Sequence, residues 1–111
     1  MGQQVKKTFS YVKYRYENGK WKITERKDFY SRASTPVGVA WQTAKVCGRV
    51  DDRNIVVAHG RYWKNPDVEV YAIWCPMLNV YNGSDSDDGS LPQDFAELWK
   101  RMRRMVERRF E

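Results

Sequence analysis

The sequence predicts an α+β domain with two layers. An antiparallel sheet of 4–5 strands, in the order ββαββ(β)α, carries a C-terminal amphipathic helix packed on one face. Short alternating or apolar runs separated by turn residues occupy most of residues 7–81 and read as strands. An apolar stripe at helical spacing ends the chain. At 111 residues the chain forms a single domain, 1–111, with one ordinary core.

Two alternating runs joined by Asn18-Gly19 fill residues 7–30. They predict a hairpin, because a type I′ turn needs positive φ at both central residues. The two-residue loop sets the register and gives each strand pair two faces. The face expected to be buried carries Val12, Tyr14, Tyr16, Trp21, Ile23 and Glu25. The face expected to be open carries Tyr11, Lys13, Arg15, Lys22, Thr24 and Arg26.

Residues 36–47 fit two structures. Thr35 or Ser34 before Pro36 matches a helix N-cap followed by proline at the first helical position. Apolar residues then recur at helical spacing, at Val37, Ala40, Trp41, Ala44 and Cys47. Helix is favoured, but the alternation of Val37, Val39, Trp41 and Thr43 leaves a strand as the alternative.

The second half of the chain predicts strands followed by a helix. Residues 54–63 and 68–74 are strand-like, and residues 77–81 form a short fifth strand. Residues 82–90 are polar and acidic and predict a flexible loop. The final helix carries its apolar stripe at Phe95, Leu98, Trp99, Met102, Met105, Val106 and Phe110, with Arg101, Arg104 and Arg108 on the opposite side.

The composition favours an anionic partner. The net charge is +6 and the isoelectric point is near 9.4. Residues 1–32 hold nine Lys or Arg against three Asp or Glu, and residues 91–111 form a second basic region. Cys47 and Cys75 lie in apolar runs and predict buried free thiols, which indicates a reducing, cytoplasmic location. No apolar run is long enough to span a membrane, so no membrane partner is expected.

The sequence lacks a catalytic constellation. No nucleophile elbow, phosphate-binding loop or metal-binding motif is present, so no catalytic residue, metal or cofactor is predicted. His59 is the only histidine. A minimal nuclease would use it as general base, with Arg61 or Lys64 holding the charged transition state. We favour a non-catalytic protein over this option.

The basic hairpin face is the main functional signal. Lys and Arg neutralise phosphates, and exposed aromatic rings stack on unpaired bases. The sequence therefore predicts a small, basic, non-catalytic nucleic-acid-binding module that favours single-stranded DNA or RNA. The predicted binding residues are Tyr11, Lys13, Arg15, Lys22, Arg26, Tyr62 and Tyr71. The competing interpretation of this face is a solvated sheet surface whose Lys and Arg prevent aggregation.

A second function class fits the same composition. A small protein-binding inhibitor or adaptor, of the type that phages and viruses encode as accessory proteins, would use exposed Trp and Tyr as anchors. The apolar stripe of the C-terminal helix also allows a homodimer through that helix.

Overall fold

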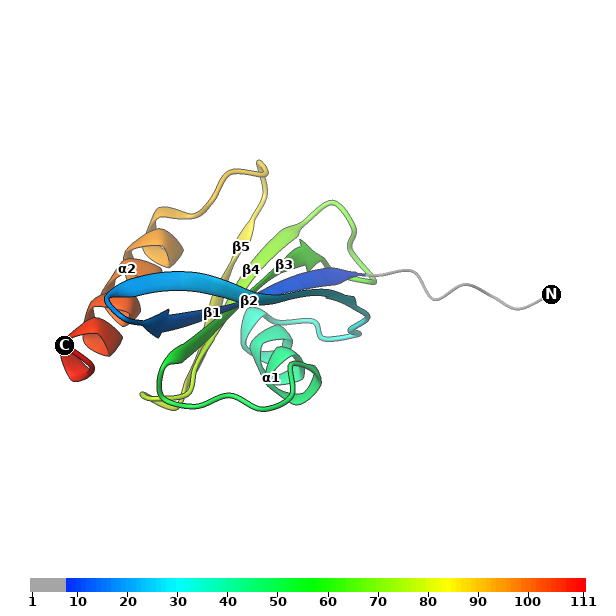
Figure 1. Cartoon of the computed structure of the whole chain (residues 1–111). Coiled ribbons are helices and arrows are strands. Elements are labelled where there is room, and N and C mark those ends of the chain that lie inside the picture. Colours follow the sequence, from blue (N-terminus) through cyan, green and yellow to red (C-terminus); the bar gives the residue numbers. More distant parts are fainter. Residues whose placement is uncertain (1–7) are drawn as a thin grey trace.

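The computed structural model describes residues 8–111. It contains one five-stranded antiparallel sheet in the order β2-β1-β3-β4-β5 and two helices (Figure 1). The elements are β1 Phe9–Glu17, β2 Lys20–Phe29, α1 Pro36–Val46, β3 Asn54–Arg61, β4 Glu69–Cys75, β5 Val80–Ser86 and α2 Gln93–Arg109. The predicted α+β class and the packing of the C-terminal helix on the sheet are confirmed.

The first two strands form the predicted hairpin, but only its turn half has the predicted register. Asn18 and Gly19 have φ values of 53° and 75°, as a type I′ turn requires. Tyr16 faces Trp21 as predicted, whereas the pairing shifts between Lys13 and Tyr14. Beyond that bulge every residue of β2 has moved by one position, and a shift of one residue exchanges the faces of a strand.

Residues 36–46 form a helix, which decides between the two predicted alternatives. Thr35 is the N-cap, and its hydroxyl oxygen accepts a 3.1 Å hydrogen bond from the Gly38 N–H. Pro36 occupies the first turn, and Gly48 follows the helix with a φ of 74°. These are the capping features that the sequence contained.

The predicted acidic loop is wrong over its first half. Residues 82–86 belong to β5, which pairs with β4 from Cys75↔Val80 to Glu69↔Ser86. This polar segment (VYNGSDS) has little strand propensity of its own. Its backbone hydrogen bonds with β4 determine the structure, and it forms one edge of the sheet.

The two helices lie on opposite faces of the sheet, so the domain has three layers rather than the two that were predicted (Figure 1). Val39 and Ala40 of α1 pack against the face formed by Val56, Ala58, Val70, Ala72 and Trp74. Phe95, Met102 and Val106 of α2 pack against Ile55, Ile73 and Cys75 on the other face. Strands β3 and β4 are apolar at nearly every position because both of their faces are covered.

Both cysteines are buried and unpaired, as predicted. Burial raises the pKa of the Cys47 and Cys75 thiols, which keeps them protonated near neutral pH. Neither helix of the described chain is long and apolar enough to cross a membrane.

Candidate nucleic-acid interface

Tyr11 is a core residue. Its side chain is 1% exposed and belongs to the apolar cluster beneath α1. The hydroxyl donates a 2.7 Å hydrogen bond to Glu25 Oε1, and burial together with this bond raises the pKa of the phenol. A ring without an open face cannot stack on a base. The prediction that Tyr11 belongs to an exposed binding face is therefore wrong.

Lys13 attaches β1 to the segment that follows α1. Its Nζ donates hydrogen bonds to the carbonyl oxygens of Cys47, at 2.6 Å, and Arg49, at 3.3 Å. The same atom lies 3.3 Å from Glu25 Oε1, and the side chain is only 13% exposed. Lys13 is therefore a structural cation, and its predicted availability to phosphate is wrong.

Arg15 and Lys22 also have acidic partners. Arg15 Nη1 lies 2.7 Å from Asp51 Oδ1, and Arg15 Nε lies 3.1 Å from Glu17 Oε1. The hydrogen bond with Asp51 is the main reason that the pKa of Arg15 is raised and that of Asp51 lowered. Lys22 shares Glu17 at 3.4 Å but remains exposed.

Arg26 lies on the opposite face from Lys13. The bulge pairs Val12 with Arg26 and Lys13 with Glu25, so the carboxylate and not the guanidinium joins the Lys13 side. The sequence predicted the reverse arrangement. The extra residue is Thr24, whose hydroxyl donates a 3.3 Å hydrogen bond to the Lys13 carbonyl. No alternation pattern in the sequence reveals a bulge at this position.

Tyr62 and Tyr71 do not extend a common platform. Tyr62 is 8% exposed in the core beneath α1, and its hydroxyl donates a 2.5 Å hydrogen bond to Asp85. Tyr71 packs in the other core, beneath α2. It stacks on His59 with ring centroids 4.3 Å apart and an interplanar angle of 8°. The two tyrosines thus lie on opposite faces of the sheet.

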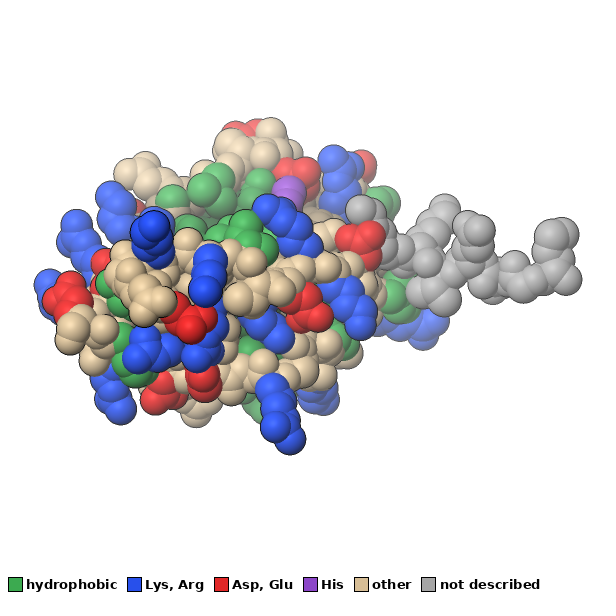
Figure 2. Space-filling model, in the orientation of Figure 1, with side chains coloured by type: hydrophobic (Ala, Val, Ile, Leu, Met, Phe, Trp, Pro, Cys, Tyr) green, Lys and Arg blue, Asp and Glu red, His purple; other side chains and the backbone are tan. Residues whose placement is uncertain are grey.

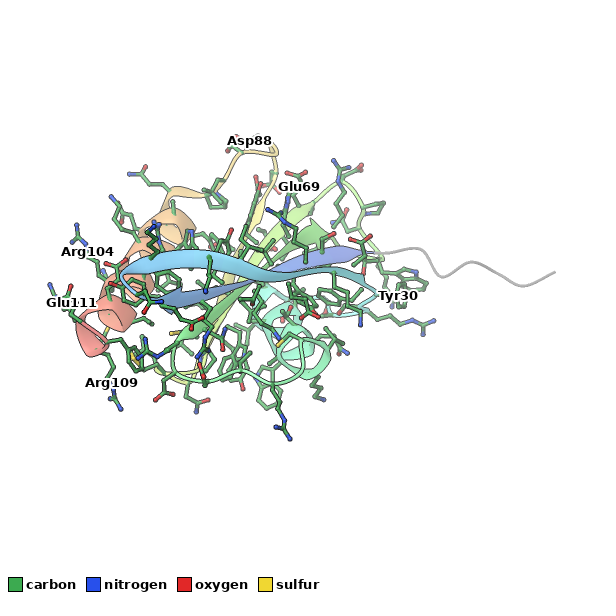
Figure 3. The ribbon with its side chains drawn as sticks, in the orientation of Figure 1. Tyr30, Glu69, Asp88, Arg104, Arg109 and Glu111 are labelled. Carbon is green, nitrogen blue, oxygen red and sulfur yellow. The ribbon has the colours of Figure 1, made fainter. Side chains whose placement is uncertain are left out.

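The surroundings of His59 are acidic. Its Nε2 lies 3.8 Å from Glu69 Oε1, which Arg61 Nη2 approaches to 3.5 Å. The pKa of Tyr71 is raised by burial and, to a smaller degree, by the charges of Glu69 and Asp88. A Cβ atom at Gly89 would lie 3.3 Å from Glu69 Oε2, so the loop that carries Asp88 passes beside Glu69 (Figure 3). Negative charge beside the His59–Tyr71 pair disfavours phosphate at this position.

The outer side of α2 carries a row of open cations. Lys100, Arg101, Arg104 and Arg108 are all exposed, and none forms an ion pair or hydrogen bond with another residue of the 8–111 segment. We call these four residues the α2 basic stripe. At a rise of 1.5 Å per residue the stripe is about 12 Å long. Figure 3 shows Arg104 pointing away from the sheet.

The β1–β2 turn adds further charge beside the stripe. Trp21 Nε1 donates a 2.7 Å hydrogen bond to Glu107 Oε2, which holds the hairpin against α2. The Arg103 guanidinium lies 4.8 Å from the centre of the Trp99 ring, and Lys20 is exposed in the turn region. Figure 2 shows Lys and Arg side chains at this end of the molecule, with Asp and Glu side chains among them.

The sequence identified part of this surface. The apolar stripe of the last helix predicts Arg101, Arg104 and Arg108 on its outer side, whereas the basic hairpin face is the sharper sequence signal for a binding surface. The useful signal was the composition of the neighbourhood. Residues 7–30 contain Glu17, Glu25 and Asp28 among their cations, whereas residues 98–106 of α2 contain Lys100, Arg101 and Arg104 and no Asp or Glu.

Within residues 8–111, no group of three or more His, Cys, Asp or Glu side chains is arranged to hold a metal ion. Comparison with known proteins adds no identification: no family model, no curated protein and no solved structure matches this chain. Its function is therefore inferred from its own residues.

Proposed function

We propose that this chain is a small, non-catalytic nucleic-acid-binding module that contacts phosphates through the α2 basic stripe. The observation that carries the proposal is the difference in pairing between the cations of β1 and those of α2. Lys13 and Arg15 are held by carbonyl and carboxylate oxygens, whereas Arg104 and Arg108 have no such partner in the described chain. Open cations are the groups that gain most from meeting phosphate.

The overall charge supports the same function. A net charge of +6 attracts a polyanion and speeds its encounter with the protein. The stripe matches the length of three to four nucleotides on one strand, at roughly 3.4 Å each. The buried thiols of Cys47 and Cys75 support a reducing location, and we propose a cytoplasmic protein.

The predicted preference for single-stranded DNA or RNA depends on exposed aromatic rings on which bases can stack. Tyr11 and Tyr62 are buried, and the Tyr71 ring is stacked against His59 near acidic side chains. Base stacking therefore has little ring surface available on the predicted residues. We propose a contact dominated by phosphate, in which single-stranded DNA or RNA and duplex compete on similar terms.

Fluorescence anisotropy with labelled single-stranded DNA, single-stranded RNA and duplex tests this function. The dissociation constant is measured between about 50 and 200 mM salt. We expect affinity to fall steeply with salt, because bound phosphates release counterions. The triple variant Arg101→Gln, Arg104→Gln and Arg108→Gln should bind at least ten times more weakly, with the salt slope reduced by about 2 to 3.

A matched control removes the same charge elsewhere. Lys27, Arg49 and Lys64 are exposed and lie away from α2, and their triple change to Gln also lowers the net charge by three. This control should retain most of the affinity. Equal losses in the two triple variants would show that net charge alone attracts the nucleic acid. Absence of binding to any of the three probes at low salt would refute the proposed function.

One observation favours the predicted alternative, a protein-binding inhibitor or adaptor. Trp63 is 46% exposed, and the Arg32 guanidinium lies 4.9 Å from its ring centre. Tryptophan and arginine are the residues most enriched in interface hot spots. This function predicts capture of a partner protein that Trp63→Ala abolishes and that moderate salt leaves intact.

A further inference from the structure

The two edges of the sheet differ in how they are protected. Edge strands commonly carry Lys, Pro or a bulge, because these features hinder pairing with another chain. β2 has several exposed cations and a bulge. β5 has the sequence VYNGSDS, which contains neither Lys, Arg nor Pro, and its ladder with β4 is regular along all seven residues. The β5 edge is therefore the more accessible one for strand pairing.

An aromatic stack continues this edge onto α1. The Trp41 and Tyr81 rings are stacked with centroids 4.9 Å apart, and the Tyr81 and Trp74 rings with centroids 4.1 Å apart. Trp41 is nevertheless 51% exposed, and Val37, one turn earlier on the helix, is 44% exposed. An apolar side of α1 thus lies directly beside the open strand.

Gly83 brings the helix this close to the edge. A Cβ atom at this position would lie 2.5 Å from the Tyr71 carbonyl oxygen and 2.7 Å from Pro36 Cβ. Any other residue would push α1 away from β5. Gly83 lies at the centre of the strand, so it is also the natural centre for a symmetric contact.

We propose that a second copy of this chain pairs with β5. The two β5 strands run antiparallel about a twofold axis at Gly83, which joins the two sheets and packs α1 of each copy near α1 of the other. The contact is isologous, as in most homodimers. It covers Trp41 and Val37, the two most exposed apolar residues of α1.

The backbone of β5 is suited to this pairing. The Gly83 N–H donates a 2.7 Å hydrogen bond to Asn82 Oδ1 of its own chain, so it points away from β4. Along an antiparallel strand the backbone groups alternate in direction, so the backbone N–H and C=O groups of Tyr81 and Asp85 point to the same side as those of Gly83. A twofold axis at Gly83 then places Tyr81 of each copy opposite Asp85 of the other. The side chain of Asn82 releases its bond when the strands pair.

Charge complementarity favours a second copy over another partner. Lys45 Nζ lies 5.9 Å from the centre of the Trp41 ring, and that ring lies on Tyr81. Because Tyr81 of one copy faces Asp85 of the other, Lys45 and Asp85 meet across the axis. The twofold axis repeats this ion pair, so it occurs twice in the dimer. One copy thus supplies both the cation and the anion that the other copy requires.

Sedimentation velocity over a range of protein concentrations tests the dimer. The wild-type chain should sediment as a dimer at micromolar concentration. Trp41→Glu should raise the dimer dissociation constant at least tenfold while leaving the circular dichroism spectrum unchanged. Ile23→Glu is the matched control, because Ile23 is 43% exposed near the opposite edge of the sheet. A wild-type monomer at all concentrations, or a dimer that Trp41→Glu does not weaken, overturns the proposal.

A charge exchange tests the register. Lys45→Glu and Asp85→Lys each place like charges together twice, so each variant alone should dimerise at least ten times more weakly. An equimolar mixture should form a heterodimer of wild-type affinity, because both cross-axis pairs become complementary again. Failure of two folded variants to recover in the mixture overturns the proposed register.

Asp85→Lys also removes the hydrogen bond from Tyr62, and this loss can unfold the variant. Hydrogen exchange in the wild-type chain then replaces the charge exchange as the test. Protection of the Tyr81, Gly83 and Asp85 amides that rises with protein concentration supports strand pairing. Protection that is independent of concentration overturns it.

Discussion

The β1–β2 hairpin and α2 both carry Lys and Arg, but the two regions use them differently. In the hairpin, Lys13 and Arg15 extend from β1 toward the segment between α1 and β3. In α2, Arg104 and Arg108 extend from the side opposite the buried stripe and point into solvent. The residue types are the same, and only the surroundings differ.

A basic pattern on a strand does not by itself define a binding surface. The face of β1 that carries Lys13 is covered because α1 packs beside it and brings carbonyl oxygens within reach. A cation that satisfies buried or half-buried oxygens contributes to folding, and its loss leaves those oxygens unpaired. A cation on the outer side of a helix satisfies no buried oxygen, so it stays available to an anion.

The hairpin and α2 should differ most in how much their side chains contribute to the free energy of unfolding. Tyr11→Ala removes a ring that is 1% exposed and a hydrogen bond to Glu25, so we expect a loss of about 3 to 5 kcal/mol in the free energy of unfolding. Urea unfolding monitored by fluorescence measures it. The Arg101, Arg104 and Arg108 triple change to Gln should stay within about 0.5 kcal/mol of wild type. A small loss for Tyr11→Ala would mean that the ring is not a core residue.

An intermediate effect is expected at Lys13. Lys13→Ala leaves the Cys47 and Arg49 carbonyl oxygens without their donor, and it should cost about 1 to 3 kcal/mol. The same unfolding experiment measures this loss. Lys22→Ala is the control, because Lys22 is exposed and makes only a 3.4 Å ion pair with Glu17. Equal losses at both positions would remove the distinction between structural and open cations within the hairpin.

The smallest effect concerns pH. Arg15 holds the pKa of Asp51 below its ordinary value, so this pair stabilises the fold above about pH 4 and loses its contribution as the pH falls further. Arg15→Gln should therefore be less stable than wild type near pH 6 and converge with it at strongly acidic pH. Asp51 is 57% exposed, so solvent screening keeps the difference below about 1 kcal/mol. Thermal unfolding as a function of pH measures it, and a constant difference would contradict the pairing.

Local signals predicted most of the fold. Asn18-Gly19 fixed the turn, Thr35-Pro36 fixed the start of α1, and the apolar stripe fixed the buried side of α2. These features depend on backbone preference or on periodicity within a few residues. The end of β5 was mispredicted because its strand structure depends on hydrogen bonds with β4 rather than on its own residues.

The candidate surface was harder to predict than the fold. Alternation along β1 grouped Tyr11, Lys13 and Arg15 correctly on one side of the strand. It gave no information on whether that side faced water or α1. The bulge at Thr24 then moved Arg26 to the other face, and an insertion of one residue leaves no trace in composition.

The sequence alone determined the hairpin turn, the start of α1 and the buried side of α2, because turn residues, caps and apolar spacing act locally. Tertiary structure alone decided which cations of β1 are covered. The reason is that the covering of a face depends on α1 and on the loop after it, which lie far away in the chain. These cations find their oxygen partners only after folding has brought the distant segments together.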